Sequence, residues 1–394
     1  MEPFLLGLLR HRVEKRQMSD LSSSSGTRRH FLKGATTLAG GVLATPFLSR
    51  RAFAQPVELT MLAWYGHAEP DVVAAFEAEH NVKFKPKYYT GGDNMLGLIA
   101  QSPPGTFDVI LSDAEYVQQL NAAGYIEELD PEDYHFNEYF PEFQQFPGHW
   151  QDGKLFSVLT RFGFLGVAYN TDALTEAEAS SYNVYWSEKL TGKVGHFDWH
   201  LPNLGQISLL QGNPSPYDID EDAWDALQKK MMTLRPQIGG FFDYGGTFSS
   251  LQNGQMLAMA GIGDWITGTL EKNGAKVRSV IPEEGGLQWT ESFSIGKGSA
   301  KADLAKQWIQ YITSAQGQVK SATMAAYPAL IPNRAGWELL ATEDPAEAKR
   351  QGMVLDNPNN AVEMIRKGRI QYRQLPVQQS LEDWNDFWSD YKGA

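Results

Sequence analysis

Aromatic and acidic side chains recur together along the 394-residue chain, a combination that suits cation binding. A cation over a Trp face gains about 0.5–2 kcal/mol, and a nearby carboxylate adds charge attraction. Aromatic walls with carboxylates also suit a sugar or another polar solute, so that alternative stays open. The candidate ligand contacts of these two types are Trp64, Asp113, Glu115, Asp264, Trp265, Trp289, Glu291 and Tyr327.

Sequence signatures of catalysis are absent. The chain has no Gly-x-Ser-x-Gly elbow, phosphate-binding loop, dinucleotide fingerprint or His-Glu-x-x-His motif. It also has no Cys, which excludes disulfides, thiolate metal sites, a Cys nucleophile and a lipid anchor on Cys. We therefore expect a binding protein with no cofactor and no catalytic residues, rather than an enzyme.

Two stretches keep a metal in consideration. His196, Asp198 and His200 alternate along a predicted strand, so their side chains would share one face. Tyr88 and Tyr89 form a pair of the kind that can bind iron(III), although a half-buried strand also explains them. An exported metal-dependent enzyme and an iron(III)-binding protein therefore remain alternatives.

Strands and helices alternate in short steps after the first 54 residues. Apolar or alternating runs predict strands, and apolar stripes at helical spacing predict helices. This order is typical of an α/β fold with a largely parallel sheet. The expected strands are 57–64, 82–89, 107–111, 164–170, 256–262 and 277–282, and the expected helices are 70–79, 94–99, 115–123, 224–232 and 302–312.

The candidate residues follow the ends of predicted strands. Trp64 ends the first strand and Asp113 follows the third. Ligands of open α/β sheets lie outside the carboxyl ends of the strands. The length suits two domains of ordinary size. The sequence thus predicts a binding cleft built from loops of an α/β protein.

An export signal occupies the beginning of the chain. Arg28 and Arg29 form the pair of a twin-arginine motif, and residues 34–48 carry no charge, which suits a signal peptide. Ala52-Phe53-Ala54 provides a small-x-small site, so we expect cleavage after Ala54. The start codon of the natural protein is either Met1 or Met18, because residues 1–17 add nothing that the export signal needs. We expect the twin-arginine translocase as a transient partner and the periplasm as the final location.

The first 54 residues and the rest of the chain have charges of opposite sign. The whole chain has a net charge of -13 although its first 54 residues are basic, so the remainder is strongly acidic. An acidic body argues against a nucleic-acid partner, because phosphate binding needs a basic surface. It is compatible with a cationic ligand.

One block resembles the periplasmic spermidine/putrescine-binding proteins of bacteria. In residues 280–295 a Pro, an acidic residue and two Gly precede Trp289, and Glu291 follows two positions later. Phe107-Asp108-Val109-Ile110 with Tyr116-Val117, and residues 326–333, are also similar to that family. The likeness extends loosely from Leu59 to the C-terminus.

The resemblance implies a two-lobed periplasmic-binding-protein fold of type II, with ligand held between lobes joined by crossing strands. It implies a monomer that delivers a cationic solute to the permease and ATPase of an ABC importer. Trp64, Trp289 and Tyr327 would form aromatic walls, and Glu291 would grip an ammonium group. Gln371 would be a further ligand contact.

Several residues depart from the family pattern. His67 stands where these proteins commonly have a Tyr, and Asp113 and Glu115 replace a small hydroxyl residue and an aromatic one. The stretch that carries two acidic ligands in the family reads Phe197-Asp198-Trp199-His200-Leu201-Pro202-Asn203 here. These changes favour a different organic cation, or an amine with an additional group that His67 would meet.

The resemblance also predicts how the chain divides between the lobes. The first lobe comprises residues 55–163 and 292–330. The second comprises 164–291 and most of 331–394. Residues 1–54 are the signal peptide.

Overall fold

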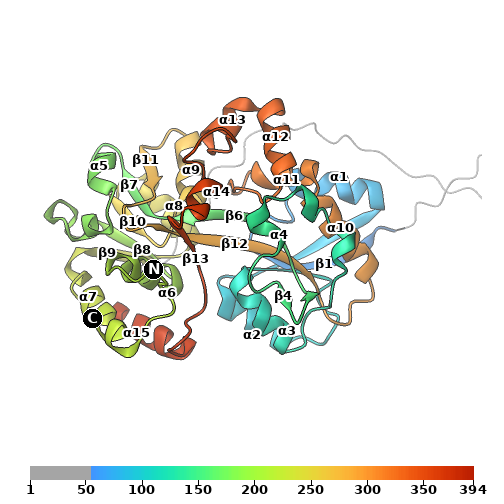
Figure 1. Ribbon diagram of the computed structural model, residues 1–394, viewed down its shortest axis with the longest axis horizontal. Helices are drawn as coiled ribbons and strands as arrows, with labels where there is room; N and C mark the ends of the chain where they lie inside the picture. The colour runs from blue at the N-terminus through green and yellow to red at the C-terminus, as the bar shows by residue number, and fades with distance from the viewer. Residues whose placement is uncertain (1–54) are drawn as a thin grey trace, which may run out of the picture. The chain divides into compact units, whose positions relative to one another are not determined.

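The computed structural model describes residues 55–394. The predicted export signal, its cleavage site after Ala54 and both candidate start methionines lie outside the described residues. From Ala54 onward the chain forms one compact unit. Figure 1 shows two α/β lobes in this unit, with strands running from one to the other.

A six-stranded sheet forms the core of the first lobe. Its order is β13–β12–β3–β1–β2, with β6 also paired to β12. β1, β2 and β3 are parallel, whereas β12 runs antiparallel to β3 and β6. The strands are β1 (Val57–Ala63), β2 (Val82–Tyr88), β3 (Val109–Ser112), β6 (Val158–Leu165), β12 (Gly286–Ile295) and β13 (Ile370–Tyr372).

Helices cover this sheet, and a small hairpin extends the lobe. α10 packs on β6 and β12, α11 packs on α1, α12 packs on α11, and α13 packs on α12. The helices are α1 (Pro70–His80), α2 (Gly92–Ala100), α3 (Val117–Ala122), α4 (Pro141–Gln144), α10 (Ala302–Thr313), α11 (Ala315–Ala322), α12 (Arg334–Glu343) and α13 (Pro345–Arg350). The hairpin pairs β4 (Trp150–Gln151) with β5 (Lys154–Leu155).

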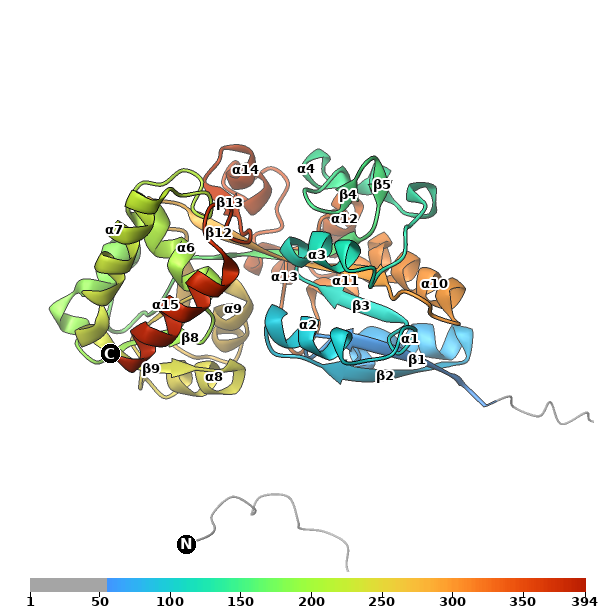
Figure 2. The same cartoon turned by 90° about the horizontal axis from the view of Figure 1, so that it is seen from below.

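A five-stranded sheet forms the core of the second lobe, in the order β11–β7–β10–β8–β9. α15 packs on α6 and α7, so the C-terminal helix covers this lobe (Figure 2). The strands are β7 (Val167–Asn170), β8 (Val194–Phe197), β9 (Ile238–Phe242), β10 (Ala258–Ala260) and β11 (Val277–Val280). The helices are α5 (Glu176–Ala179), α6 (His200–Leu210), α7 (Glu221–Met232), α8 (Tyr244–Gln252), α9 (Asp264–Lys272), α14 (Ala361–Arg366) and α15 (Leu381–Gly393).

Two long strands connect the lobes. β6 and β12 pair antiparallel from Leu165–Leu287 to Val158–Phe293, and Figure 1 shows them crossing the middle of the molecule. Every residue of β12 is buried, which fits a strand covered on both faces. Residues on this pair therefore lie where the lobes meet.

Local sequence signals explain the elements that carry the site. α1 begins at Pro70, where the missing N–H costs no helical hydrogen bond, and ends at Asn81 in the left-handed conformation (φ 50°). α10 buries Trp308, Ile309 and Ile312 along one stripe, as its spacing predicts. These helices hold the sheet from which the cleft loops project.

The predicted α/β class is correct, but two predicted strands differ. The expected strand at 164–170 is two strands separated by Gly166, because there the chain passes from the crossing pair into the second sheet. The strand expected at 256–262 is only β10, since the residues after Ala260 lead into α9. The predicted division of the chain between the lobes stays a prediction.

Within residues 55–394, no helix is both long enough and apolar enough to cross a membrane.

Candidate ligand-binding site

A cavity of about 150 Å³ lies where loops of both lobes meet. Trp64 and Asp113 reach it from the ends of β1 and β3, and Phe197 reaches it from the end of β8. This is the carboxyl edge of the strands, where the fold class predicts a ligand. The full lining is Trp64, Tyr65, Tyr89, Thr90, Asp113, Leu165, Phe197, Trp199, Tyr244, Gly261, Trp265, Trp289, Glu291, Tyr327 and Arg373.

Aromatic rings from both lobes form the walls. The ring centroid of Trp64 lies 4.8 Å from that of Tyr89 and 6.4 Å from that of Trp199. On another side Trp265 lies 5.8 Å from both Tyr244 and Tyr327. Such rings offer flat apolar faces with negative potential, which suit a cation or an alkyl chain.

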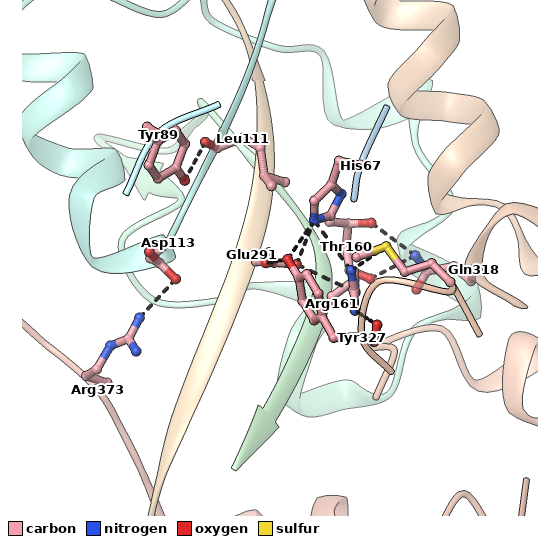
Figure 3. A network of polar contacts seen from close by, with 11 residues as sticks. His67, Tyr89, Leu111, Asp113, Thr160, Arg161, Glu291, Gln318, Tyr327 and Arg373 are labelled. Carbon is pink, nitrogen blue, oxygen red and sulfur yellow. Dashed lines mark hydrogen bonds and ion pairs between the residues drawn. The ribbon is translucent and has the colours of Figure 1, made fainter. Parts of the chain in front are cut away.

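Glu291 lies at the centre of a buried polar group (Figure 3). Its Oε1 accepts a hydrogen bond from the Tyr327 hydroxyl at 2.6 Å, and its Oε2 lies 3.0 Å from Nε2 of His67. The Nε atom of Arg161 lies 3.5 Å from the same Oε2. Only 3% of Glu291 is exposed. Both carboxylate oxygens therefore already have protein partners.

Arg161 supplies the charge that balances Glu291. Burial would raise the pKa of Glu291, but its contacts with His67, Arg161 and Tyr327 hold it at about 2. Burial lowers the pKa of His67 below 6.5, so this imidazole is neutral at pH 7. The lasting positive charge beside Glu291 is then the guanidinium of Arg161.

Other contacts fix Arg161 in place. Its Nη2 donates to the backbone oxygen of Tyr327 at 2.9 Å, and its Cζ lies 4.5 Å from the centroid of the Tyr327 ring. Nη1 lies 3.0 Å from Sδ of Met324. The group of His67, Arg161, Glu291 and Tyr327 thus ties the crossing strands to the first-lobe loops.

A second ionic group surrounds Arg373. Its Nε donates to Oε1 of Glu115 at 2.5 Å, and its Nη2 lies 2.9 Å from Oδ1 of Asp113. Its Cζ lies 4.3 Å from the ring centroid of Trp199. Two carboxylates therefore share one guanidinium, all of them buried.

This sharing leaves Asp113 incompletely stabilised as an anion. Burial raises its pKa to about 8; Arg373 opposes the shift, and the charges of Glu115 and Glu291 add to it. Oδ2 of Asp113 has no hydrogen-bond partner within residues 55–394. The backbone N–H of Ala114 donates to the Thr290 hydroxyl at 3.1 Å and holds this loop on β12.

A sequence model of the bacterial extracellular solute-binding proteins matches residues 71–370. The match covers well over half of the chain. This protein belongs to that family.

Curated relatives of this solute-binding protein are similar over most of its length. The spermidine/putrescine-binding periplasmic protein of Salmonella typhimurium is 21% identical over 307 residues, which cover 78% of this chain and 86% of the relative. The putrescine/cadaverine-binding protein of Pseudomonas aeruginosa is 22% identical over 293 residues, covering 71% of this chain and 78% of the relative. The resemblance to the spermidine/putrescine-binding proteins is thereby confirmed.

Solved structures confirm the two-lobed fold of this solute-binding protein. A putative spermidine/putrescine ABC transporter from Listeria monocytogenes matches with a TM-score of 0.72 at 18% identity, covering 85% of this chain and 98% of that one. The PBP MotA from A. tumefaciens B6 in complex with glucopine matches with a TM-score of 0.66 at 16% identity, covering 85% and 100%. The family and these relatives are solute-binding proteins of transport systems rather than enzymes.

The structure brings most of the predicted contacts to one place. Six of them line the cavity: Trp64, Asp113, Trp265, Trp289, Glu291 and Tyr327. His67 and Glu115 stand behind this lining and contact Glu291 and Arg373, respectively.

The other two predicted contacts are not in the lining. Asp264 is half-buried at the start of α9, and its Oδ1 accepts a hydrogen bond from the backbone N–H of Phe164 at 3.3 Å. Gln371 is also absent from the lining, and its amide donates to the backbone oxygen of Gly368 at 2.7 Å. Gln371 lies on β13, which pairs with the far end of β12.

Neither arginine of the site, Arg161 or Arg373, is among the residues predicted from the sequence. Arg161 lies just before the predicted strand at 164–170, and Arg373 lies two residues beyond Gln371. Trp199 was also missed, although it belongs to the stretch considered for a metal. A search for aromatic residues after every predicted strand would have found Trp199, but no local signal marks the arginines.

The three residues considered as metal ligands do not come together. Nδ1 of His196 lies 2.6 Å from Asn203, whereas Asp198 accepts from the indole N–H of Trp388 and from Lys392. His200 begins α6, because the strand ends at Phe197 and alternation stops there. Within residues 55–394, no group of His, Asp and Glu is arranged to hold a metal.

The tyrosine pair is separated in the same way. The hydroxyl of Tyr88 donates to Glu69 at 3.2 Å, and that of Tyr89 donates to the backbone oxygen of Leu111 at 2.9 Å. Successive residues of a strand point to opposite faces, so the two hydroxyls diverge.

Proposed function

We propose that this protein captures a small organic amine between its lobes and delivers it to the permease and ATPase of an ABC importer. The observation that carries the proposal is the cavity itself. It combines aromatic walls from both lobes with a buried carboxyl, Asp113, whose Oδ2 has no hydrogen-bond partner within residues 55–394. Both features favour a ligand with a positively charged group, whose arrival would ionise Asp113.

Closure of the lobes explains how such a site gains affinity. Trp64 and Asp113 come from the first lobe, and Trp199 and Trp265 from the second, so the enclosure is complete only when the lobes meet. Excluding water then strengthens the carboxylate–ammonium attraction. Hinge bending at β6 and β12 is the corresponding motion. The permease releases the amine by favouring the open form through differential contacts.

The dimensions favour a compact amine over a long polyamine. A cavity of about 150 Å³ is similar in size to one that accommodates a benzene-sized molecule. A linear polyamine also needs a carboxylate at each end, whereas Glu291 is already paired with Arg161. The names of the relatives mention spermidine, putrescine, cadaverine, glucopine and GABA, which supports a fold that accepts more than one kind of ligand.

The proposal includes where and how the protein works. Curated relatives are periplasmic proteins, and the twin-arginine motif with cleavage after Ala54 would bring this chain to the same place. There it would act as a monomer that binds the free amine and carries it to the permease.

A thermal-shift screen of the purified protein tests this function. Ligand at about a thousand times its dissociation constant stabilises a protein by about 4 kcal/mol, which raises the melting temperature by several degrees. We expect a shift with at least one of putrescine, spermidine, choline, butylamine and amino-acid amines. Shifts only with sugars, inorganic anions or iron(III), or with nothing, would contradict the proposal.

A further inference from the structure

Two carboxylates of the cavity region differ in how much of their charge the protein balances. Glu291 has the guanidinium of Arg161 to itself, with two further hydrogen-bond donors, His67 and Tyr327. Asp113 shares the guanidinium of Arg373 with Glu115. The Asp113 group therefore carries one negative charge in excess when both of its acids are ionised.

The free atoms of Asp113 point to what would balance that charge. Oδ1 faces Arg373 at 2.9 Å, but Oδ2 has no hydrogen-bond partner within the described chain. Asp113 is 4% exposed and lines the cavity. An unpaired acceptor at such a place is costly unless a donor arrives. A ligand ammonium supplies such a donor, and its charge balances the second carboxylate once Asp113 is ionised.

Aromatic rings flank this carboxylate. The hydroxyl of Tyr89 is tied to Leu111, two residues before Asp113. The Trp199 ring lies against the guanidinium that Asp113 contacts, and the Trp64 ring neighbours both Tyr89 and Trp199. Figure 3 shows Asp113 and Arg373 set apart from the group around Glu291. An ammonium at Oδ2 would thus have aromatic faces beside it.

We propose that Asp113 receives the ammonium group of the ligand, while Glu291 serves to hold the wall of the cavity. This inference rests on the proposed function and names its recognition residue. It reverses the roles implied by the resemblance, in which Glu291 grips the ammonium. The departure at position 113, an acid in place of a small hydroxyl residue, then accounts for a ligand preference different from that of the family.

Asp113→Asn tests the assignment. The probes are putrescine, choline and butylamine, each paired with its neutral isostere: 1,4-butanediol, 3,3-dimethylbutan-1-ol and 1-butanol. Titration calorimetry or thermal shift gives the affinity for each amine relative to its isostere. We expect Asp113→Asn to reduce this preference at least tenfold. Its melting temperature without ligand should be unchanged or higher, because Arg373 keeps Glu115 as its partner.

Glu291→Gln is the matched control. Removing its charge leaves Arg161 buried without a carboxylate, so the melting temperature should fall by several degrees. The preference for an amine over its isostere should survive, even where both affinities fall. Asp113→Ser, which restores a small hydroxyl residue, should behave as Asp113→Asn does and serves as a second variant if the first does not fold.

The outcomes separate the two proposals. An amine preference that persists in both Asp113 variants, or is lost only in Glu291→Gln, overturns the role of Asp113 and leaves amine capture intact. Binding of none of the amines to the unaltered protein overturns both.

Discussion

The two acidic side chains that line this cavity differ in how far the protein balances their charge. Glu291 and Asp113 both line it, and both are buried. Their pKa values move in opposite directions, to about 2 for Glu291 and about 8 for Asp113. Both are buried, but Glu291 is stabilised by His67, Arg161 and Tyr327, whereas Asp113 shares Arg373 with Glu115 and lies near the charges of Glu115 and Glu291.

Binding should therefore depend on pH through Asp113. In the free protein this carboxyl holds a proton at pH 7, since its pKa is about 8. An ammonium at Oδ2 lowers that pKa, so binding releases the proton. Amine affinity should rise by up to about tenfold per pH unit from pH 6 to 8 and level off above. The amine itself stays charged, because alkylammonium groups titrate near pH 10.

Calorimetry in two buffers of different ionisation enthalpy measures this proton release. We expect close to one proton released per amine bound at pH 7. Asp264 is a second possible source of a proton, because burial raises its pKa to about 7. Asp113→Asn distinguishes the two, since it should abolish most of the proton release if Asp113 is the source. Affinity independent of pH, or equal proton release in the variant, would contradict this account.

The sequence indicates the aromatic and acidic contacts but not their counter-ions. Trp64 and Asp113 can be found because each follows a readable strand, and the fold class places strand ends at one edge. Arg373 pairs with Glu115 across 258 positions of sequence, and no local pattern encodes such a contact. For the same reason the sequence could not distinguish the paired Glu291 from the under-compensated Asp113.

At the scale of elements, the crossing strands both join the lobes and shape the cavity. Gly163 of β6 pairs with Trp289 of β12. A Cβ atom at Gly163 would lie 2.5 Å from two atoms of the Trp289 indole. Because Gly163 has no side chain, the Trp289 indole can pack against its backbone and line the cavity.

Gly163→Ala should displace Trp289 and weaken amine binding about tenfold, or about 1.4 kcal/mol. Gly97→Ala in α2 is the control, because its Cβ would come no closer than 3.9 Å to any neighbouring atom. That change should leave affinity unaltered and stabilise the helix by about 0.5–1 kcal/mol. Equal amine affinity of Gly163→Ala and the unaltered protein, by calorimetry, would show that Trp289 does not form the wall.

Helices and strands with a strong local sequence pattern are predicted well. The strands that cross between the lobes are not, because their structure depends on contacts with both lobes. The stripe of Trp308, Ile309 and Ile312 is enough to predict α10. The expected strand at 164–170 captures β7 but only the last two residues of β6, which begins at Val158. Every residue from 158 to 163 is buried, so the period-2 pattern that identifies a half-exposed strand is missing there.

At the scale of the whole molecule, an aromatic contact joins the two lobes beside the cavity, since Tyr65 and Tyr244 both line it. The ring centroid of Tyr65 lies 5.4 Å from that of Tyr88 at the end of β2 and 6.4 Å from that of Tyr244 on α8. β2 and α8 thus face one another from different lobes. Capture of an amine by hinge closure should bring these elements together from an open form.

The absence of Cys from the chain allows this motion to be measured directly. Lys85→Cys on β2 and Asn253→Cys after α8 place one label on each lobe, both at exposed positions. The side chain of Lys85 is 68% exposed, and its only ion pair within residues 55–394 is a surface contact of 3.7 Å with Glu58. Loss of that pair should cost little stability.

The distance between these two labels, by double electron–electron resonance with and without amine, tests the central claim. We predict that an amine found in the screen shortens the mean distance and narrows its distribution, whereas 1,4-butanediol leaves both unchanged. A distance that stays the same at saturating amine, or that shortens equally with the neutral diol, would contradict capture of a cationic amine between the lobes.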